Sequence, residues 1–326
     1  MCTAVRFTDT QGNPFFGRNL DWTFDFGEQV LVVPQGFKPA TPFGATPVVE
    51  HAFIGMGVIG DGQPLMFDAA NEFGLAVAGL NFPGYAGSAT DAVDGCINVT
   101  PWEFPMWVCA RHTSVAEVRE ELSRVAIVDK QLGPDWPTAQ LHWIVSDAAD
   151  CIIVEYTPDG MQVFDNKIGV LANQPGFGWH AENLRNYLNV GRDFVPAGTF
   201  TSPDTTFGPL APFGAGSSQR GLPGDYSSPS RFVRAAYVNA SHPVKEDEKA
   251  NVSRMFHTLQ QVAMVEGSAI ACDGRTELTL YTSCYSAPTR TYYYNTYDDM
   301  TLRSACLSDY LLDPIDEENP QIRVVA

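Results

Sequence analysis

The chain has 326 residues and a formal net charge of −18; 44% of its residues are hydrophobic and 12% are aromatic. This composition supplies ample apolar material for a large buried core. The acidic balance excludes a nucleic-acid-binding protein, because phosphates require a basic protein face, and it argues against attraction to anionic membranes. We interpret the acidity as that of a solvated surface.

The first 22 residues predict a β-hairpin. Short apolar runs flank a polar turn at residues 9–13, which is a hairpin signal. The second run, residues 15–22, is interrupted by Arg18 and Asp21, and such residues are rarely buried unless they are paired. If the hairpin forms, both side chains return alongside Cys2, where a guanidinium would stabilise a thiolate.

Further short strands are expected up to residue 85, with a hairpin turn at Asp61 and Gly62. Residues 55–60 match GxGxxG, the pattern of a dinucleotide-binding loop. That loop must open a helix and be followed by an acidic residue about 20 positions on. Here another strand-like run follows, and position 80 is Leu80, so we reject the dinucleotide interpretation.

The rest of the chain alternates strands and helices around one long loop. Ser114 begins a capping box and so predicts a helix behind it. We expect loops over 128–140 and 196–229, strands over 141–156, 161–170, 277–284 and 290–295, and helices after Pro229 and over 247–265. Without a repeat or a dividing linker, the chain is predicted to be one α+β domain, residues 1–326.

Seven cysteines, an odd number without a CxxC pair, are typical of reduced thiols in the cytoplasm. The chain opens without a leader pattern, and no apolar run approaches the length of a membrane span, so we expect a cytoplasmic protein without membrane insertion. The six histidines are dispersed, without HExxH or zinc spacing. We therefore expect neither a metal nor an organic cofactor.

Cys2 is a candidate nucleophile. Aminopeptidases remove an initiator methionine before a small residue, which would leave Cys2 with a free α-amine beside its own thiol. An α-amine with a reference pKa of about 7.7–8.0 is a usable base, and a thiol is a better nucleophile than a hydroxyl. One residue could thus supply both functions. The alternative is that position 2 merely tolerates any small residue.

Six sequence blocks resemble the choloylglycine hydrolase family, which are cysteine-dependent N-terminal-nucleophile hydrolases and include bile salt hydrolases and penicillin V acylases. The blocks occur in one order and span essentially the whole chain, which makes the set highly specific. They are MCTAVRF, FFGRNLDW, NEFGLAVAGLNFPGYA (71–86), LANQPGF (171–177), GLPGDYSSPSRFVRAAY (221–237) and YYYNTYDDM (292–300).

The resemblance implies a four-layer αββα sandwich of two stacked, mostly antiparallel sheets, and a homotetramer assembled through the 196–229 segment. It also implies an active site built around the Cys2 nucleophile. By this similarity, Arg18 lies beside the nucleophile, Asp21 at the α-amine, Asn81 and Asn173 at the oxyanion and substrate, and Arg231 also in the active site.

Taken alone, these residues leave other interpretations open. Arg18 and Asp21 could form a structural pair, and a lone asparagine after a strand more often makes an Asx turn. Arg231 near a helix start could be only a surface cation. A non-catalytic binder of amphipathic acids remains a further alternative, although such a binder would be free to lose the nucleophile.

The acyl group of the substrate is predicted to bind at an alternating apolar and aromatic rim at the end of the hairpin. This rim consists of Leu20, Trp22, Phe24 and Phe26. Such a rim would suit a steroid body or a phenoxyacetyl group. In the family that the chain resembles, bile salt hydrolases tend to carry Asn at the position of Asn81, whereas penicillin V acylases often carry Tyr. We therefore predict a hydrolase of glycine- or taurine-conjugated bile salts, with penicillin V acylase or another N-acyl amidase as the alternative.

Overall fold

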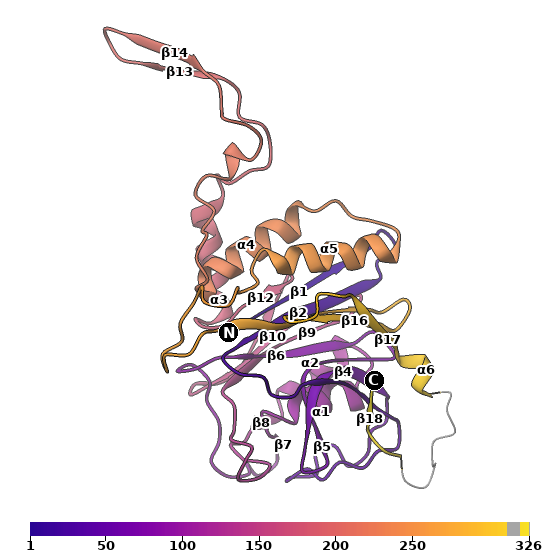
Figure 1. Cartoon of the computed structure of the whole chain (residues 1–326). Coiled ribbons are helices and arrows are strands. Elements are labelled where there is room, and N and C mark those ends of the chain that lie inside the picture. The colour runs from indigo at the N-terminus through magenta and orange to yellow at the C-terminus, as the bar shows by residue number, and fades with distance from the viewer. Residues whose placement is uncertain (312–319, 326) are drawn as a thin grey trace.

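A computed structural model describes residues 1–311 and 320–325. It has four layers (Figure 1). Helices α4 (Ser228–Ser241) and α5 (Glu248–Gln260) cover a six-stranded sheet, which packs on an eight-stranded sheet whose outer face carries α1 (Phe104–Arg111) and α2 (Val115–Leu122). The expected αββα sandwich is therefore confirmed.

The six-stranded sheet contains the predicted N-terminal hairpin. Strands β1 (Cys2–Thr8) and β2 (Pro14–Trp22) pair antiparallel, with Cys2 opposite Leu20 and Ala4 opposite Arg18. The hairpin prediction is confirmed. The sheet order is β12 (Val170–Leu171), β1, β2, β15 (Leu278–Ser286), β16 (Thr291–Thr296) and β17 (Arg303–Cys306).

The eight-stranded sheet is antiparallel throughout. Its order is β11 (Gly160–Asp165), β10 (Cys151–Thr157), β9 (Leu141–Ser146), β6 (Ala76–Asn81), β5 (Gln63–Asn71), β4 (Phe53–Gly60), β3 (Gln29–Val33) and β18 (Arg323–Val324). The GxGxxG match lies within β4, and Asp61, at a φ of 48°, turns the chain directly into β5. A strand at this position excludes the helix that a dinucleotide loop requires.

Shorter elements lie in the connections between the strands of the two sheets. They are the parallel pair β7 (Ile97–Val99) and β8 (Val125–Ile127), the hairpin β13 (Gly198–Thr201) and β14 (Thr206–Leu210), helices α3 (Phe177–Asn183) and α6 (Leu307–Leu311), and the 3₁₀ turns η1 (Leu184–Tyr187) and η2 (Ser217–Gln219). None of the helices in the described part of the chain combines the length and the apolar character that a bilayer crossing requires.

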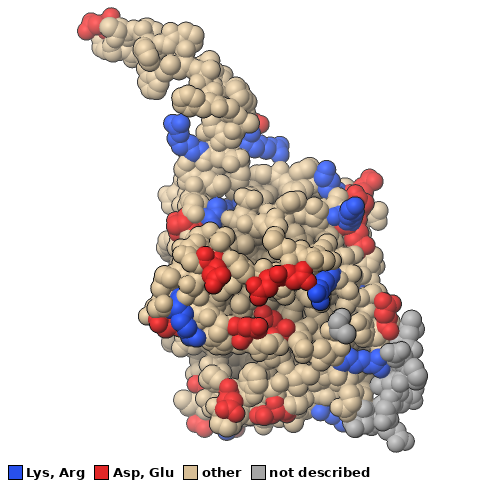
Figure 2. All heavy atoms as spheres, viewed as in Figure 1, with Lys and Arg blue, Asp and Glu red and all other residues tan. Residues whose placement is uncertain are grey.

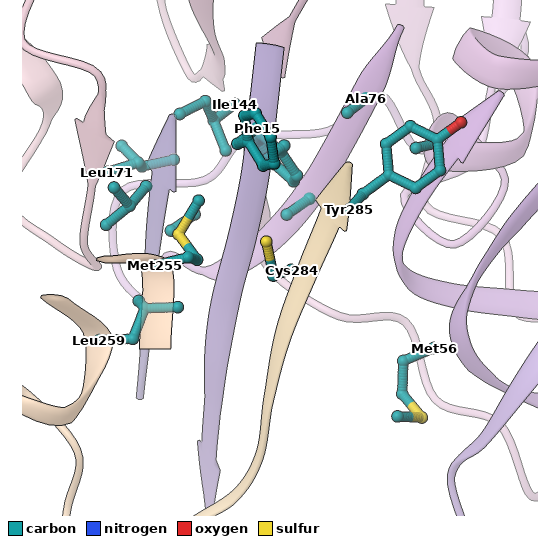
Figure 3. Packing of buried hydrophobic residues seen from close by; sticks show 14 of the residues in the cluster. Phe15, Met56, Ala76, Ile144, Leu171, Met255, Leu259, Cys284 and Tyr285 are labelled. Atoms are coloured by element: carbon teal, nitrogen blue, oxygen red, sulfur yellow. The ribbon is translucent and has the colours of Figure 1, made fainter. Parts of the chain in front are cut away.

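The main core lies between the six-stranded sheet and its neighbours on both sides. Met255 and Leu259, one turn apart on α5, point toward the sheet and join Phe15 and Cys284 in one buried cluster (Figure 3). The amphipathic spacing of α5 thus determines which face of the helix is buried. This packing also covers the outer face of the hairpin that carries Cys2.

Local sequence signals located some boundaries and missed others. Ser114 accepts a hydrogen bond from the backbone N–H of Glu117, so the predicted cap of α2 is confirmed. The single strand expected over 141–156 is wrong, because Asp147 accepts backbone hydrogen bonds from Ala149 and Asp150 and turns the chain between β9 and β10. Helix α1 was missed because seven of its eight residues are apolar and buried, which removes the helical periodicity.

The segment expected as a long loop over 196–229 contains an exposed arm. Strands β13 and β14 pair within it and project far from the body of the molecule (Figure 1). Phe200 and Phe207 stand opposite each other on the arm and are 74% and 68% exposed. Asp204 is the only charged residue between positions 194 and 216, and the surface of the arm is correspondingly almost free of charge (Figure 2). Exposed aromatics on an uncharged projection are typical of an interaction surface.

Candidate active site

Cys2 is the first residue of β1 and is 2% exposed. Its backbone nitrogen donates to Oδ1 of Asn173 at 2.6 Å. The β1–β2 pairing holds Cys2 opposite Leu20, so the hairpin register fixes the position of the sulfur. The thiol lies between the two sheets, because it contacts Arg18, whose guanidinium reaches carbonyls of the eight-stranded sheet.

Arg18 contacts the sulfur directly: its Nη2 lies 2.7 Å from Sγ of Cys2. The guanidinium is completely buried, with Nη1 donating to the carbonyls of Phe67 and Gly79 and Nε donating to that of Asn19. Burial by itself lowers the pKa of Arg18, but the charge of Cys2 contributes to a net increase above the ordinary value. A buried cation fixed by three carbonyls stabilises an anion at the sulfur.

Asp68 lies behind this guanidinium and was missed by the sequence analysis. Its carboxylate accepts hydrogen bonds from the hydroxyls of Tyr281, at 2.5 Å, and Tyr292, at 2.7 Å. Burial raises the pKa of Asp68, while the charge of Arg18 and the two tyrosines lower it. The three partners come from β2, β15 and β16, so no local pattern could have linked them.

Arg231 approaches from the first turn of α4. Its Nη1 donates to the backbone oxygen of Cys2 and to Oγ1 of Thr3, both at 2.5 Å, and its Nη2 donates to Oδ1 of Asn173 at 2.7 Å. Its Nε donates to the carbonyl of Tyr226. Burial lowers the pKa of Arg231. A completely buried guanidinium with four such contacts is not a surface cation.

Asp21 is also completely buried. Its Oδ1 accepts a hydrogen bond from Oγ1 of Thr279 at 2.6 Å, and its Oδ2 lies 3.7 Å from Nη1 of Arg231. Oδ2 has no hydrogen-bond partner among the described residues. One carboxylate oxygen therefore remains available beside the start of the chain.

Met1 occupies the space in front of Cys2. Its α-ammonium donates to the backbone oxygen of Asp21 at 2.5 Å and forms an ion pair with the carboxylate of Glu277. Burial lowers the pKa of this ammonium, Cys2 and Asp21 raise it, and Arg231 and Arg18 lower it. Glu277 was not identified from the sequence, because a single acidic residue before a strand carries no distinguishing signal.

Asn173 connects several parts of the site. Its Oδ1 receives the contacts from Cys2 and Arg231, and its Nδ2 donates to the backbone oxygen of Asn81 at 2.7 Å. His180 holds the Asn173 backbone by a 2.9 Å contact between Nε2 and the carbonyl oxygen. Burial lowers the pKa of His180 to about 4, so this ring is neutral at pH 7. The amide orientation of Asn173 is thus fixed on both sides.

A second histidine supports the same segment. His142 in β9 lies 2.8 Å from the carbonyl of Ala172 through Nε2 and 3.1 Å from Oε1 of Glu155 through Nδ1. Glu155 also accepts from the backbone N–H of Phe177 at 2.8 Å. These groups position the chain around Asn173. In the described part of the chain, no three or more His, Cys, Asp or Glu side chains are grouped to hold a metal.

The predicted apolar rim forms an aromatic cluster next to the hairpin. The rings of Trp22, Phe24 and Phe26 contact one another at centroid distances of 4.7–6.2 Å, and Phe26 also contacts Phe67. Phe24 is 43% exposed, whereas Leu20 is buried in the core. The exposed part of this surface therefore consists of the aromatic residues, with Leu20 beneath them.

Known proteins share this architecture and sequence. "Linear amide C-N hydrolases, choloylglycine hydrolase family" is the description of the family whose pattern matches residues 2–320. A bile salt hydrolase/transferase of Bifidobacterium longum subsp. longum is 49% identical over 96% of this chain and 97% of its own. A conjugated bile acid hydrolase of Lactobacillus acidophilus is 43% identical over 96% and 98%.

A solved structure agrees with these matches. The crystal structure of a mutant conjugated bile acid hydrolase from Clostridium perfringens superposes with a TM-score of 0.89 at 34% identity, covering 100% of this chain and 97% of that one. The sequence, the four layers and the buried N-terminal site lead to the same assignment: the chain belongs to the choloylglycine hydrolase family of linear amide C–N hydrolases.

Proposed function

We propose that this enzyme hydrolyses the amide bond of glycine- or taurine-conjugated bile salts, with Cys2 as the nucleophile. The observation that carries the proposal is the 2.7 Å contact between Arg18 and the sulfur of a residue that becomes the chain start once Met1 is removed. Relatives named for bile salt or conjugated bile acid hydrolysis, at 43–49% identity over nearly the whole chain, support the substrate class.

The base in this mechanism is the α-amine of Cys2. While Met1 is attached, the nitrogen of Cys2 is an amide and has no basic lone pair. After its removal the free amine takes the thiol proton, directly or through one water, and the thiolate attacks the acyl carbonyl. The free carboxylate oxygen of Asp21 is available to hold the amine in place. The protonated amine then returns its proton to the leaving nitrogen.

The oxyanion of the tetrahedral intermediate is assigned to Asn81 and Asn173. The Nδ2 of Asn173 has two N–H groups, and one of them already donates to the Asn81 backbone. A fixed amide of this kind needs little reorganisation during the reaction, and an oxyanion donor is worth about 2.7–4 kcal/mol of transition-state stabilisation. Collapse of the intermediate releases the amine and leaves a thioester, which water hydrolyses.

The acyl body is assigned to the surface formed by Trp22, Phe24 and Phe26, with Leu20 beneath it. Three adjoining aromatic rings suit a flat apolar body such as a steroid. Asn81 favours conjugated bile salts over penicillin V, for which a family pattern of Tyr would be expected. Penicillin V acylase or another N-acyl amidase stays the alternative enzyme, and a non-catalytic binder the alternative without chemistry.

Substrate choice is tested by measuring amine release from glycocholate, taurocholate and penicillin V with the purified, reduced protein. We expect faster turnover of the two bile salts. Cys2→Ser should lower the rate roughly a thousandfold or more, because the nucleophile is lost. A preference for penicillin V would contradict the substrate class, and turnover that survives Cys2→Ser would contradict the nucleophile.

The pH dependence tests the amine base. Nη1 of Arg231 donates to the backbone oxygen of Cys2, so its positive charge lies close to the α-amine of the same residue and disfavours the protonated amine; Arg231→Met should therefore raise the pKa of the amine. The amine acts as a base only when it is neutral, so activity rises as the pH increases through the pKa of the amine. Because this pKa is higher in the variant, the acidic limb of its rate profile should move to higher pH. Arg234→Met, on the same helix, is the control and should leave the limb in place. An unmoved limb in Arg231→Met would exclude the amine as the titrating base.

We further infer a single-domain cytoplasmic enzyme, residues 1–326, assembled as a homotetramer through the arm. Seven cysteines without a disulfide among the described residues support a reducing compartment. The exposed Phe200 and Phe207 support burial of the arm by another copy of the chain, since large apolar surfaces of this kind are costly in water.

Assembly is tested by light scattering on two matched double variants. Phe200→Asp with Phe207→Asp places charge on one cross-strand pair of the arm, and Thr201→Asp with Thr206→Asp does so on the adjacent pair. We expect a tetrameric mass for the unmodified chain and for the threonine variant, and a smaller mass for the phenylalanine variant, because burying the new carboxylates is unfavourable. A monomeric unmodified chain would contradict the proposal.

A further inference from the structure

A cavity of about 610 Å³ lies at the other end of β1 from the nucleophile. Because the last three residues of β1, from Arg6 to Thr8, line the cavity, its wall lies roughly 13 to 20 Å from Cys2 along the strand at about 3.3 Å per residue. It lies where β1, α4 and α5 meet the base of the arm, and Val190 and Leu222 line it from the two ends of that base. Its volume is in the range of sites for small organic ligands, about 300–1,000 Å³.

Arg254 of α5 lines this cavity and has an unusual environment. It is 5% exposed, yet its Nε and Nη1 have no hydrogen-bond partner among the described residues. Its Nη2 donates to the backbone oxygen and Oδ1 of Asn239, and its Cζ lies 3.7 Å from the ring centroid of Phe7. Burial lowers the pKa of Arg254 to about 10, so the group is still charged at neutral pH. A buried cation with two unsatisfied donors lacks a compensating anion.

The other charged groups at the cavity do not supply that anion. Arg6 also has a buried Nε without a partner, and its Nη2 donates only to the carbonyls of Asp147 and Ala148. Lys167 pairs with Asp150, the one acidic residue among those that line the cavity in the described chain. Among the described residues, neither Arg6 nor Arg254 forms an ion pair with a carboxylate. A chain of net charge −18 thus has a cavity with excess positive charge.

The remaining walls are largely apolar. They include Phe7, Leu184, Val190, Leu222, Val233 and Ala236. A small inorganic anion would satisfy the arginines but leave these walls unoccupied, whereas a neutral apolar molecule would leave the guanidiniums uncompensated. An anionic head on an apolar body satisfies both requirements.

We propose that this cavity is a second, non-catalytic ligand site for an amphipathic monoanion, with the positive charge of Arg254, Arg6 and Lys167 in its wall attracting the carboxylate or sulfonate head and the apolar walls packing against its body. The proposal uses none of the groups around Cys2, so it stands independently of the proposed hydrolysis. A ligand bound here would also contact the base of the arm through Val190 and Leu222.

The test is calorimetric titration of the full chain with decanoate and, as the uncharged probe, 1-decanol. Arg254→Met keeps an unbranched, flexible apolar stem and removes the charge together with the hydrogen-bond donors. We expect it to weaken decanoate binding by about tenfold or more, as loss of a charged hydrogen bond implies, while 1-decanol binding is unchanged. Lys167 lines the cavity but its side chain is 76% exposed, so Lys167→Glu should weaken decanoate binding by a smaller factor. Lys38 is exposed in the loop after β3 and does not line the cavity, so the control Lys38→Glu should leave decanoate binding unchanged.

Thermal unfolding without ligand separates this site from a purely structural arginine. If Arg254 lacks a compensating anion in the ligand-free protein, Arg254→Met should unfold at the same or a higher temperature, because an uncompensated buried cation has been removed. Equal decanoate binding by the unmodified chain, Arg254→Met and Lys167→Glu would overturn the proposal. So would a change of oligomeric mass in these variants without any loss of decanoate binding, since the cavity would then serve contact between copies.

Discussion

The contact between the Arg18 guanidinium and the Cys2 sulfur is the interaction on which the site depends. The guanidinium is held by carbonyls from both sheets: those of Phe67 and Gly79 on the eight-stranded sheet and that of Asn19 on the six-stranded sheet. A charge buried this deeply is costly unless it has a partner. The stacking of the sheets therefore fixes a cation where an anionic sulfur is stabilising, and the fold and the chemistry share one constraint.

Helix α4, in the outer layer, adds further contacts to the site that the two sheets form. Arg231 reaches from α4 to the Cys2 carbonyl and to Asn173, while His142 and His180 hold the chain around Asn173. Buried polar networks are favourable only when nearly every member is satisfied. The unsatisfied Oδ2 of Asp21 is thus informative, because it lies 3.7 Å from Nη1 of Arg231, which also donates to the backbone oxygen of Cys2, and so leaves an acceptor near the start of the chain.

The hairpin and its polar residues were predictable because their signal is local: a turn, two apolar runs, and an Arg and an Asp out of pattern. Asp68 and Glu277 were not predictable, because their partners lie far from them in the sequence. The partners of Asp68 are Tyr281 and Tyr292, and that of Glu277 is Met1. No spacing rule joins such positions. Family resemblance assigned Asn173 and Arg231 to the site, but only the three-dimensional structure shows that both contact the Cys2 backbone. Helix α1 escaped because uniform burial removes the amphipathic period.

The role of the Cys2 α-amine as the base is tested most directly by measuring amide hydrolysis before and after the chain start is freed. The protein would be purified behind a removable N-terminal tag whose cleavage leaves Cys2 as the first residue, and intact mass would establish each state. If the α-amine of Cys2 is the base, no appreciable hydrolysis is expected until that amine is exposed, and full activity is expected afterwards. Equal hydrolysis by the tagged and cleaved forms would contradict this role, because the base would then have to be another group.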